Sequence, residues 1–160
     1  MAQALGFFFG LLVGSFLNVC IWRMPRNQSI AWPGSHCTAC QKPLRWFDNI
    51  PVFSYLALRG KCHSCAVRIP FRYPVVELLG GLAGWAAFTF WTGPYAAAAA
   101  VIFWALIVVI WVDWEHMIIL DEISVGGTVL GLAFSFFFPA WVAGPEGAAG
   151  WSAAGRSLVG

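Results

Sequence analysis

Charged side chains are scarce in this 160-residue chain: Asp, Glu, Lys and Arg make up 10% of the residues, and 60% are hydrophobic. A soluble domain has roughly 25% charged and 45 to 50% apolar residues, so this composition excludes an ordinary soluble fold. It predicts an integral membrane protein that is in contact with the lipid bilayer. Nothing in it suggests a nucleic-acid partner.

The first five residues, MAQAL, also lack a positive side chain. A cleaved secretory signal peptide needs a basic start, a shorter apolar core and a small-residue cleavage site. We therefore interpret the apolar run over residues 4–22 as a permanent span, because about 20 apolar residues cross a bilayer. Gly10, Gly14 and Ser15 give this span a face of small residues, which predicts close packing against another helix rather than a substrate groove.

The few basic residues are unevenly distributed along the chain. Eight of the nine Lys and Arg residues fall between residues 23 and 72, and six of the seven acidic residues follow that segment. Positive residues in short loops mark the cytoplasmic side of a membrane protein. We therefore expect residues 26–73 to face the cytoplasm and the N-terminus to be periplasmic.

This basic segment contains two Cys-x-x-Cys pairs, Cys37 with Cys40 and Cys62 with Cys65, separated by 21 residues. Four thiolates at this spacing can close tetrahedrally on one zinc ion, and a structural metal would stabilise a module too short to rely on its own core. The pairs could instead form disulfides or act as redox dithiols. A cytoplasmic location argues against disulfides, and a redox pair needs no matched second copy.

Three more apolar runs follow, at residues 74–91, at residues 95–112 and from residue 118 or 123 to residue 141. The predicted fold class is therefore an all-α polytopic membrane protein with about four transmembrane helices and a small zinc-ribbon-like module between the first two. The domains that we predict are residues 1–25 for the first span, residues 26–73 for the cysteine module, residues 74–142 for the second to fourth spans, and residues 143–160 for a periplasmic loop and the start of a further, incomplete helix.

Acidic residues gather after the third apolar run, at Asp113, Glu115, Asp121 and Glu122. A charge held at the bilayer centre costs roughly 2.5 to 3.5 kcal/mol, and less near the interface, so an acid at the end of a span is a functional candidate. The alternative is that these acids only mark where the helix leaves the membrane. Counting crossings places Asp113 on the same side as the cysteine module. Glu77, just inside the second span, is expected to pair with the basic loop.

Several motifs stand in order along the chain: GLLVGSFLNV at residues 10–19, the two cysteine pairs, DNIP at residues 48–51, LRGKC at residues 58–62, RYPVVE at residues 72–77 and DWEHMIILD at residues 113–121. Together they resemble the bacterial type IV prepilin peptidases, which are membrane aspartic proteases of type IV pilus and type II secretion systems. The resemblance implies cleavage of the leader peptides of prepilins and pseudopilins at the cytoplasmic face of the inner membrane. It also implies methylation of the new N-terminus with S-adenosylmethionine.

Carried over residue by residue, the resemblance makes Asp113 the first of two catalytic aspartates and the four cysteines named above the ligands of a structural zinc ion. Two departures stand out. The family has a proline before the aspartate at position 121, where this chain has Leu120, so we expect a weaker break in the helix after Asp113. The second catalytic aspartate of the family lies in a Gly-x-Gly-Asp motif, which residues 1–160 do not contain.

An aspartic protease needs two carboxylates that share a proton, one ionised to activate water and one neutral to donate to the peptide carbonyl. Along a continuous helix, Asp113 and Asp121 would lie roughly 12 Å apart, too far to share a proton. We therefore expect the chain to be the N-terminal part of a longer enzyme and to be inactive alone.

Two functions of other classes stay open. Four spans with two dithiol pairs also suit a membrane thiol oxidoreductase that exchanges electrons with a quinone, and a third interpretation is a non-catalytic zinc-module scaffold of a secretion system. The oxidoreductase would need exposed, redox-active cysteines on an oxidising side of the membrane. The sequence also leaves open whether the chain forms a homo-oligomer.

Overall fold

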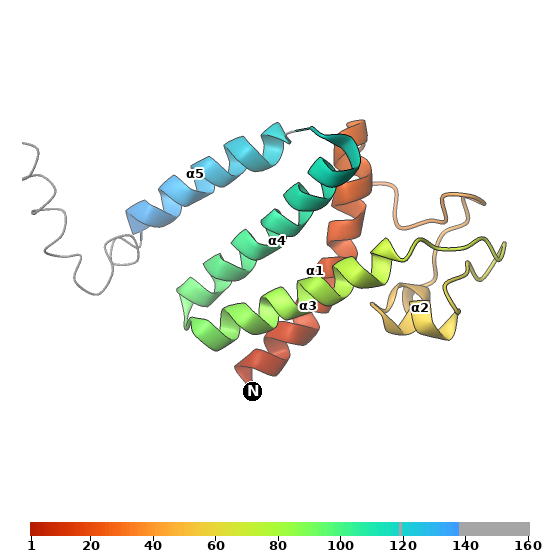
Figure 1. The fold of residues 1–160 in the computed structure, drawn as a ribbon, viewed down its shortest axis with the longest axis horizontal. Coiled ribbons are helices and arrows are strands. Elements are labelled where there is room, and N and C mark those ends of the chain that lie inside the picture. Colours follow the sequence, from red (N-terminus) through yellow and green to blue (C-terminus); the bar gives the residue numbers. More distant parts are fainter. Residues whose placement is uncertain (119, 138–160) are drawn as a thin grey trace, which may run out of the picture. The chain divides into compact units, whose positions relative to one another are not determined.

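The computed structural model describes residues 1–118 and 120–137, and in these residues the chain forms five α-helices and no β-strand (Figure 1). The helices are α1 (Ala2–Arg23), α2 (Phe53–Ala57), α3 (Arg72–Phe90), α4 (Pro94–His116) and α5 (Asp121–Phe137). Two short 3-10 helices, Met24–Arg26 and Trp46–Asn49, lie in the connection between α1 and α3. The predicted all-α fold class is confirmed.

Three helices within the described part of the chain are long and apolar enough to cross a membrane: Ala2–Arg26, Arg72–Phe90 and Pro94–His116. They match the first three predicted spans to within a few residues. Large apolar side chains such as Phe8 and Ile110 are about 60% exposed on them, as contact with lipid requires. α5 begins where the fourth span was predicted, whereas the predicted end of that span and the loop over residues 143–160 lie outside the described residues.

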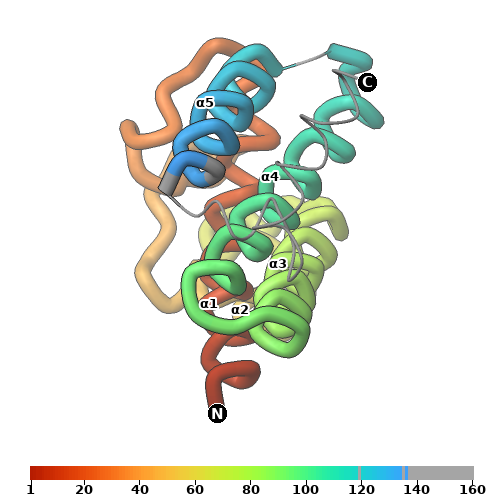
Figure 2. The backbone as a smooth tube through the Cα atoms, turned by 90° about the vertical axis from the view of Figure 1, so that its left-hand side faces the viewer, coloured from red at the N-terminus to blue at the C-terminus, as the bar shows by residue number. Residues whose placement is uncertain are grey.

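α1 packs along α3 in the antiparallel sense, and α4 packs against both of them (Figures 1 and 2). Glycines allow the backbones of α1 and α3 to touch. A Cβ atom on Gly10 would collide with the carbonyl oxygen of Gly80, and one on Gly14 would lie 2.6 Å from the Cα atom of Glu77. The predicted small-residue packing face is therefore confirmed, and it faces α3.

α4 joins this pair through small residues and one tryptophan. Ala96, Ala99 and Ala100 are buried, and the indole N–H of Trp104 donates a hydrogen bond to the carbonyl of Gly80 at 3.0 Å. The turn before α4 contains Gly93 with a φ of 58°, a left-handed conformation that glycine adopts without strain. Alanine and glycine thus allow close approach in a membrane segment, where packing rather than burial from water holds helices together.

The helix that contains Asp113 ends three residues after it, although no proline follows. The expectation of a weaker break at this point is therefore wrong. α4 ends at His116 because Met117 adopts a left-handed conformation, with φ 52° and ψ 40°, and its N–H donates to the carbonyl of Asp113 at 2.8 Å. Such a turn closes a helix C-terminus by satisfying a free carbonyl. The separation calculated for Asp113 and Asp121 along a continuous helix therefore does not apply. The chain divides here into two compact units, Met1–Ile119 and Leu120–Gly160.

Candidate functional site

The first Cys-x-x-Cys pair lies in a tight loop closed by backbone hydrogen bonds. The N–H of Cys37 donates to the carbonyl of Lys42 at 3.0 Å, and the N–H of Gln41 donates back to the carbonyl of Cys37 at 2.9 Å. Gln41 has a φ of 60°, which turns the chain sharply after the second cysteine. This loop directs both of its thiols to the same side.

The second pair lies in a loop of the same construction. The N–H of Cys62 donates to the carbonyl of Val67 at 2.8 Å, and the N–H of Ala66 donates to the carbonyl of Cys62 at 2.9 Å. Ala66 has a φ of 57° and takes the place of Gln41 in the first loop. The cysteine module is therefore an internal repeat at the level of the backbone, although the two loops share little sequence beyond the cysteines.

The two loops bring the four predicted metal ligands together. All four Sγ atoms lie within 4.8 Å of one another, the Sγ atoms of Cys37 and Cys65 are 3.8 Å apart, and the cysteines are free thiols. Zinc–sulfur bonds of about 2.3 Å in a tetrahedron place the sulfurs about 3.8 Å apart. The donor set and its spacing therefore fit a tetrahedral site for one zinc ion.

The electrostatics of the cluster also suit a bound cation. A hydrogen bond from the backbone of Val67 lowers the pKa of Cys65, but desolvation and the three neighbouring thiols outweigh it and raise the pKa to about 12. Four sulfurs this close resist becoming four anions. A divalent cation held by the four thiols would remove that resistance, because it would stabilise every thiolate that it contacts.

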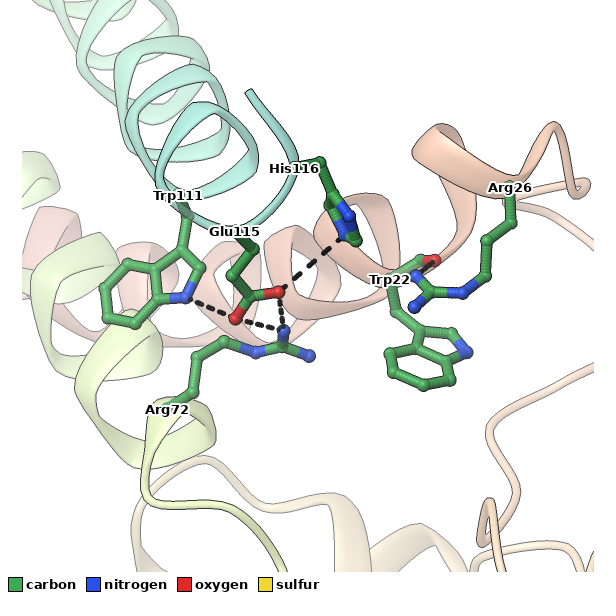
Figure 3. A network of polar contacts seen from close by, with 6 residues as sticks. All are labelled: Trp22, Arg26, Arg72, Trp111, Glu115 and His116. Atoms are coloured by element: carbon green, nitrogen blue, oxygen red, sulfur yellow. Dashed lines mark hydrogen bonds and ion pairs between the residues drawn. The ribbon is translucent and has the colours of Figure 1, made fainter. Parts of the chain in front are cut away.

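Asp113 lies in the last turns of α4, close to an ion pair that fixes this end of the helix. The guanidinium of Arg72, at the start of α3, donates to both carboxylate oxygens of Glu115 at 2.8 and 2.7 Å. The indole N–H of Trp111 donates to the same carboxylate at 3.1 Å, and His116 lies 3.9 Å from it (Figure 3). Because Arg72 directly follows the cysteine module, this ion pair places Asp113 and the module at the same end of the helices.

The Asp113 side chain itself is exposed. Two residues along an α-helix correspond to roughly 200° of rotation, so Asp113 points away from the side on which Glu115 meets α3. Asp121 and Glu122 lie in the first turn of α5, which belongs to the other compact unit. Asp113 is thus accessible to a ligand.

Glu77 meets the basic loop in a way that differs from the prediction. Its carboxylate accepts a hydrogen bond from the backbone N–H of Val52 at 2.7 Å. Among the described residues, no Lys or Arg side chain forms an ion pair with it. The expected link between Glu77 and the loop is present, but a backbone group rather than a basic side chain makes it.

Sequence reasoning missed the partners of two residues. Arg72 was only part of a motif, yet it pairs with Glu115, 43 positions away. Asn18 is buried and donates to the carbonyl of Tyr73 at 3.1 Å, 55 positions away. A buried amide in the last turns of an apolar helix was the available signal, because such a group needs a partner on another helix.

Comparison with known proteins adds the following similarities. The family model described as the bacterial peptidase A24 N-terminal domain matches residues 8–91, which contain α3 and all four clustered cysteines but not Asp113. The chain is 43% identical to the prepilin leader peptidase/N-methyltransferase of Myxococcus xanthus over 131 residues, which are 81% of this chain and 39% of that relative. It is 34% identical to the protein of the same name in Pseudomonas putida over 166 residues, which are 88% of this chain and 57% of the relative.

A further relative is the type 4 prepilin-like proteins leader peptide-processing enzyme of Escherichia coli, which is 33% identical over 84% of this chain and 65% of its own length. The chain therefore spans between 39% and 65% of the length of these three relatives. No solved structure matches the chain significantly.

Proposed function

Because the chain belongs to the bacterial peptidase A24 N-terminal domain family, we propose that it works as a prepilin leader peptidase of the aspartic type and as an N-methyltransferase. Its substrates are type IV prepilins and pseudopilins. The observation that supports this most is the Arg72–Glu115 ion pair, which holds the end of α4 beside the start of α3. Asp113 therefore lies at the same end of the helices as the cysteine module, which is the end at which we propose that the leader is cut.

In this proposal Asp113 supplies one of the two catalytic carboxylates. One carboxylate takes a proton from water while the other, kept neutral, donates to the carbonyl of the scissile peptide. The family's second aspartate belongs to a Gly-x-Gly-Asp motif that residues 1–160 lack. We therefore expect residues 1–160 expressed by themselves to leave a prepilin uncut.

Cys37, Cys40, Cys62 and Cys65 hold a structural zinc ion in the proposed enzyme, and S-adenosylmethionine supplies the methyl group. Because positive residues in short loops favour the cytoplasmic side, we propose that the module faces the cytoplasm at the inner membrane and that the N-terminus is periplasmic. Nothing in the described structure or in the comparisons favours a thiol oxidoreductase or a non-catalytic scaffold.

The test measures removal of the leader from a prepilin in bacterial membranes. It uses the whole protein that the source gene encodes. We expect Asp113→Asn to lower the cleavage rate at least about 100-fold, because a removed acid–base group typically costs that factor or more. Glu122→Gln, an exposed acid on α5, serves as the matched control and should cleave normally. Mass spectrometry of the pilin measures both leader loss and N-methylation. Normal cleavage by Asp113→Asn at normal protein levels would show that Asp113 is not catalytic.

A further inference from the structure

A cavity of about 180 Å³ lies where the cysteine module meets α1 and α3. Its walls include Asn18 and Trp22 of α1, Tyr73 and Glu77 of α3, and Tyr55 and Cys62 of the module. For scale, an engineered apolar cavity of roughly 150 Å³ holds a benzene molecule. The space therefore accommodates an amino-acid-sized group, and none of the residues assigned to peptide cleavage lines it.

Asn18, which lines this cavity, has an unused hydrogen-bond acceptor. Asn18 is only 2% exposed, and its amide nitrogen donates to the carbonyl of Tyr73 at 3.1 Å and to that of Gly14 at 3.4 Å. Its Oδ1 atom is buried and has no hydrogen-bond partner among the described residues. A buried acceptor without a partner is costly, so this oxygen calls for a donor.

The carboxylate of Glu77 is a second acceptor in the same wall. Glu77 is 8% exposed, receives one hydrogen bond from the N–H of Val52 at 2.7 Å, and also interacts with the hydroxyl of Ser15. A carboxylate has about four acceptor sites, and a buried negative charge requires a cation or several donors. Glu77 is one helical turn from Tyr73, the partner of Asn18, so both residues line the cavity at about the same level of the helix pair.

Two buried acceptors beside aromatic rings define the chemistry of the ligand. A primary ammonium group carries three donors and one positive charge, so it can satisfy both Glu77 and Asn18. The rings of Trp22, Tyr55 and Tyr73 add favourable contacts for a cation or a flat group. We propose that this cavity binds a primary ammonium group of its ligand, with Glu77 and Asn18 as the acceptors.

The identity of the amine rests on the proposed function. Transfer of a methyl group to a new N-terminus brings together two molecules that each carry a primary amine: the methyl donor, at its amino-acid end, and the processed chain, at its N-terminus. Both present the same ammonium chemistry to Glu77. Binding experiments with each source distinguish them.

The experiment is equilibrium dialysis of the protein, purified in detergent, against three labelled probes. S-adenosylmethionine and S-adenosylhomocysteine carry the amino-acid end, whereas 5′-methylthioadenosine lacks it. We expect the first two to bind the wild-type protein about 10- to 100-fold more tightly than the third, as one or two charge-assisted hydrogen bonds imply. Glu77→Gln keeps the acceptor for Val52 but removes the charge, and it should abolish this preference. Glu122→Gln is the control outside the cavity.

A fourth probe is a short peptide with a free N-terminus, compared with its N-acetylated form. Glu77-dependent binding of the free peptide but not of the nucleosides would also support the amine site, with the processed chain as the source. Equal affinity for all three nucleosides together with equal binding of both peptides would overturn the proposal and leave a cavity filled by water. Zinc content reports whether Glu77→Gln is folded. Dialysis does not depend on cleavage, so the two tests can fail separately. Normal leader removal by Asp113→Asn would contradict the proposed cleavage mechanism and leave the amine site standing.

Discussion

The α1–α3 interface and the cysteine module are stabilised in opposite ways. The helices meet where side chains are missing, since Gly10 and Gly80 bring their backbones into contact. The module converges on side chains, with four sulfurs within 4.8 Å, while Trp32 and Trp46 remain 79% and 82% exposed. Burial of apolar side chains stabilises neither region strongly. Lipid tails are as apolar as the helix side chains that they contact, and a short loop module has little core of its own. Close backbone packing serves the first, and the metal that we propose would serve the second.

The largest effect should come from removing one sulfur of the module. Structural zinc in small domains contributes about 10 to 16 kcal/mol of apparent binding free energy, so loss of one ligand should unfold the module. We expect Cys62→Ser to reduce the zinc content from about one ion per chain to nearly none, measured by elemental analysis of the purified protein. Cys20→Ala, at a buried cysteine of α1, is the matched control and should keep its zinc. Full zinc content in Cys62→Ser would contradict the assignment.

A smaller effect should follow from adding one methyl group to the helix interface. A Cβ atom on Gly10 meets the backbone of Gly80, which cannot move aside cheaply, whereas one on Gly126 of α5 meets nothing within 4 Å. We expect Gly10→Ala to lower the free energy of unfolding by about 1 to 3 kcal/mol, the usual cost of overpacking. Gly126→Ala should be neutral or stabilising by up to about 1 kcal/mol. Unfolding in mixed micelles compares them, and equal stabilities would mean that the close approach contributes little.

The smallest effect should come from the ion pair that joins the two helix ends. The side chain of Arg72 is 11% exposed and that of Glu115 is 32% exposed, so solvent weakens their attraction. We expect a double-mutant cycle with Arg72→Gln and Glu115→Gln, measured by unfolding in mixed micelles, to give a coupling free energy of about 0.2 to 1 kcal/mol between the two side chains. The same cycle on Arg45 and Asp48, a pair within one turn of the module, is the control and should leave the unfolding of the helices unchanged. A coupling of zero would remove the ion pair as the element that positions the end of α4.

Local sequence patterns predicted much of this structure. Apolar runs of bilayer length gave the first three spans, and the spacing of the four cysteines gave the cluster, because both depend on residues close together in the chain. The break at Met117 was not predictable, since methionine has no preference for the left-handed conformation that closes α4. The absence of a proline at position 120 therefore says less about the helix than the turn itself does.

Long-range polar contacts were the other part that sequence could not supply. The partners of Asn18 and Arg72 are 55 and 43 positions away, and the partner of Glu77 is a backbone N–H without any sequence signature. The first contact depends on the register that the glycine interface sets between α1 and α3, whereas the other two depend on how α3 meets α4 and the cysteine module. The sequence therefore indicated which residues are candidates for the site, while the packing of the helices decided which of them meet.

The repeated cysteine loops have a consequence for the order in which the chain assembles. α1 leaves the ribosome with its bare glycine face well before α3 exists, and the module lies between them. If zinc joins Cys37 to Cys65 as proposed, it shortens the free connection between the helices by more than half. Each halving of a loop lowers the entropic cost of closing it by about 0.6 kcal/mol. This reduction in the cost of loop closure is small. It would act during synthesis, however, when α1 does not yet have α3 to pack against. Supply of zinc to the nascent chain would then govern how efficiently the two helices find each other.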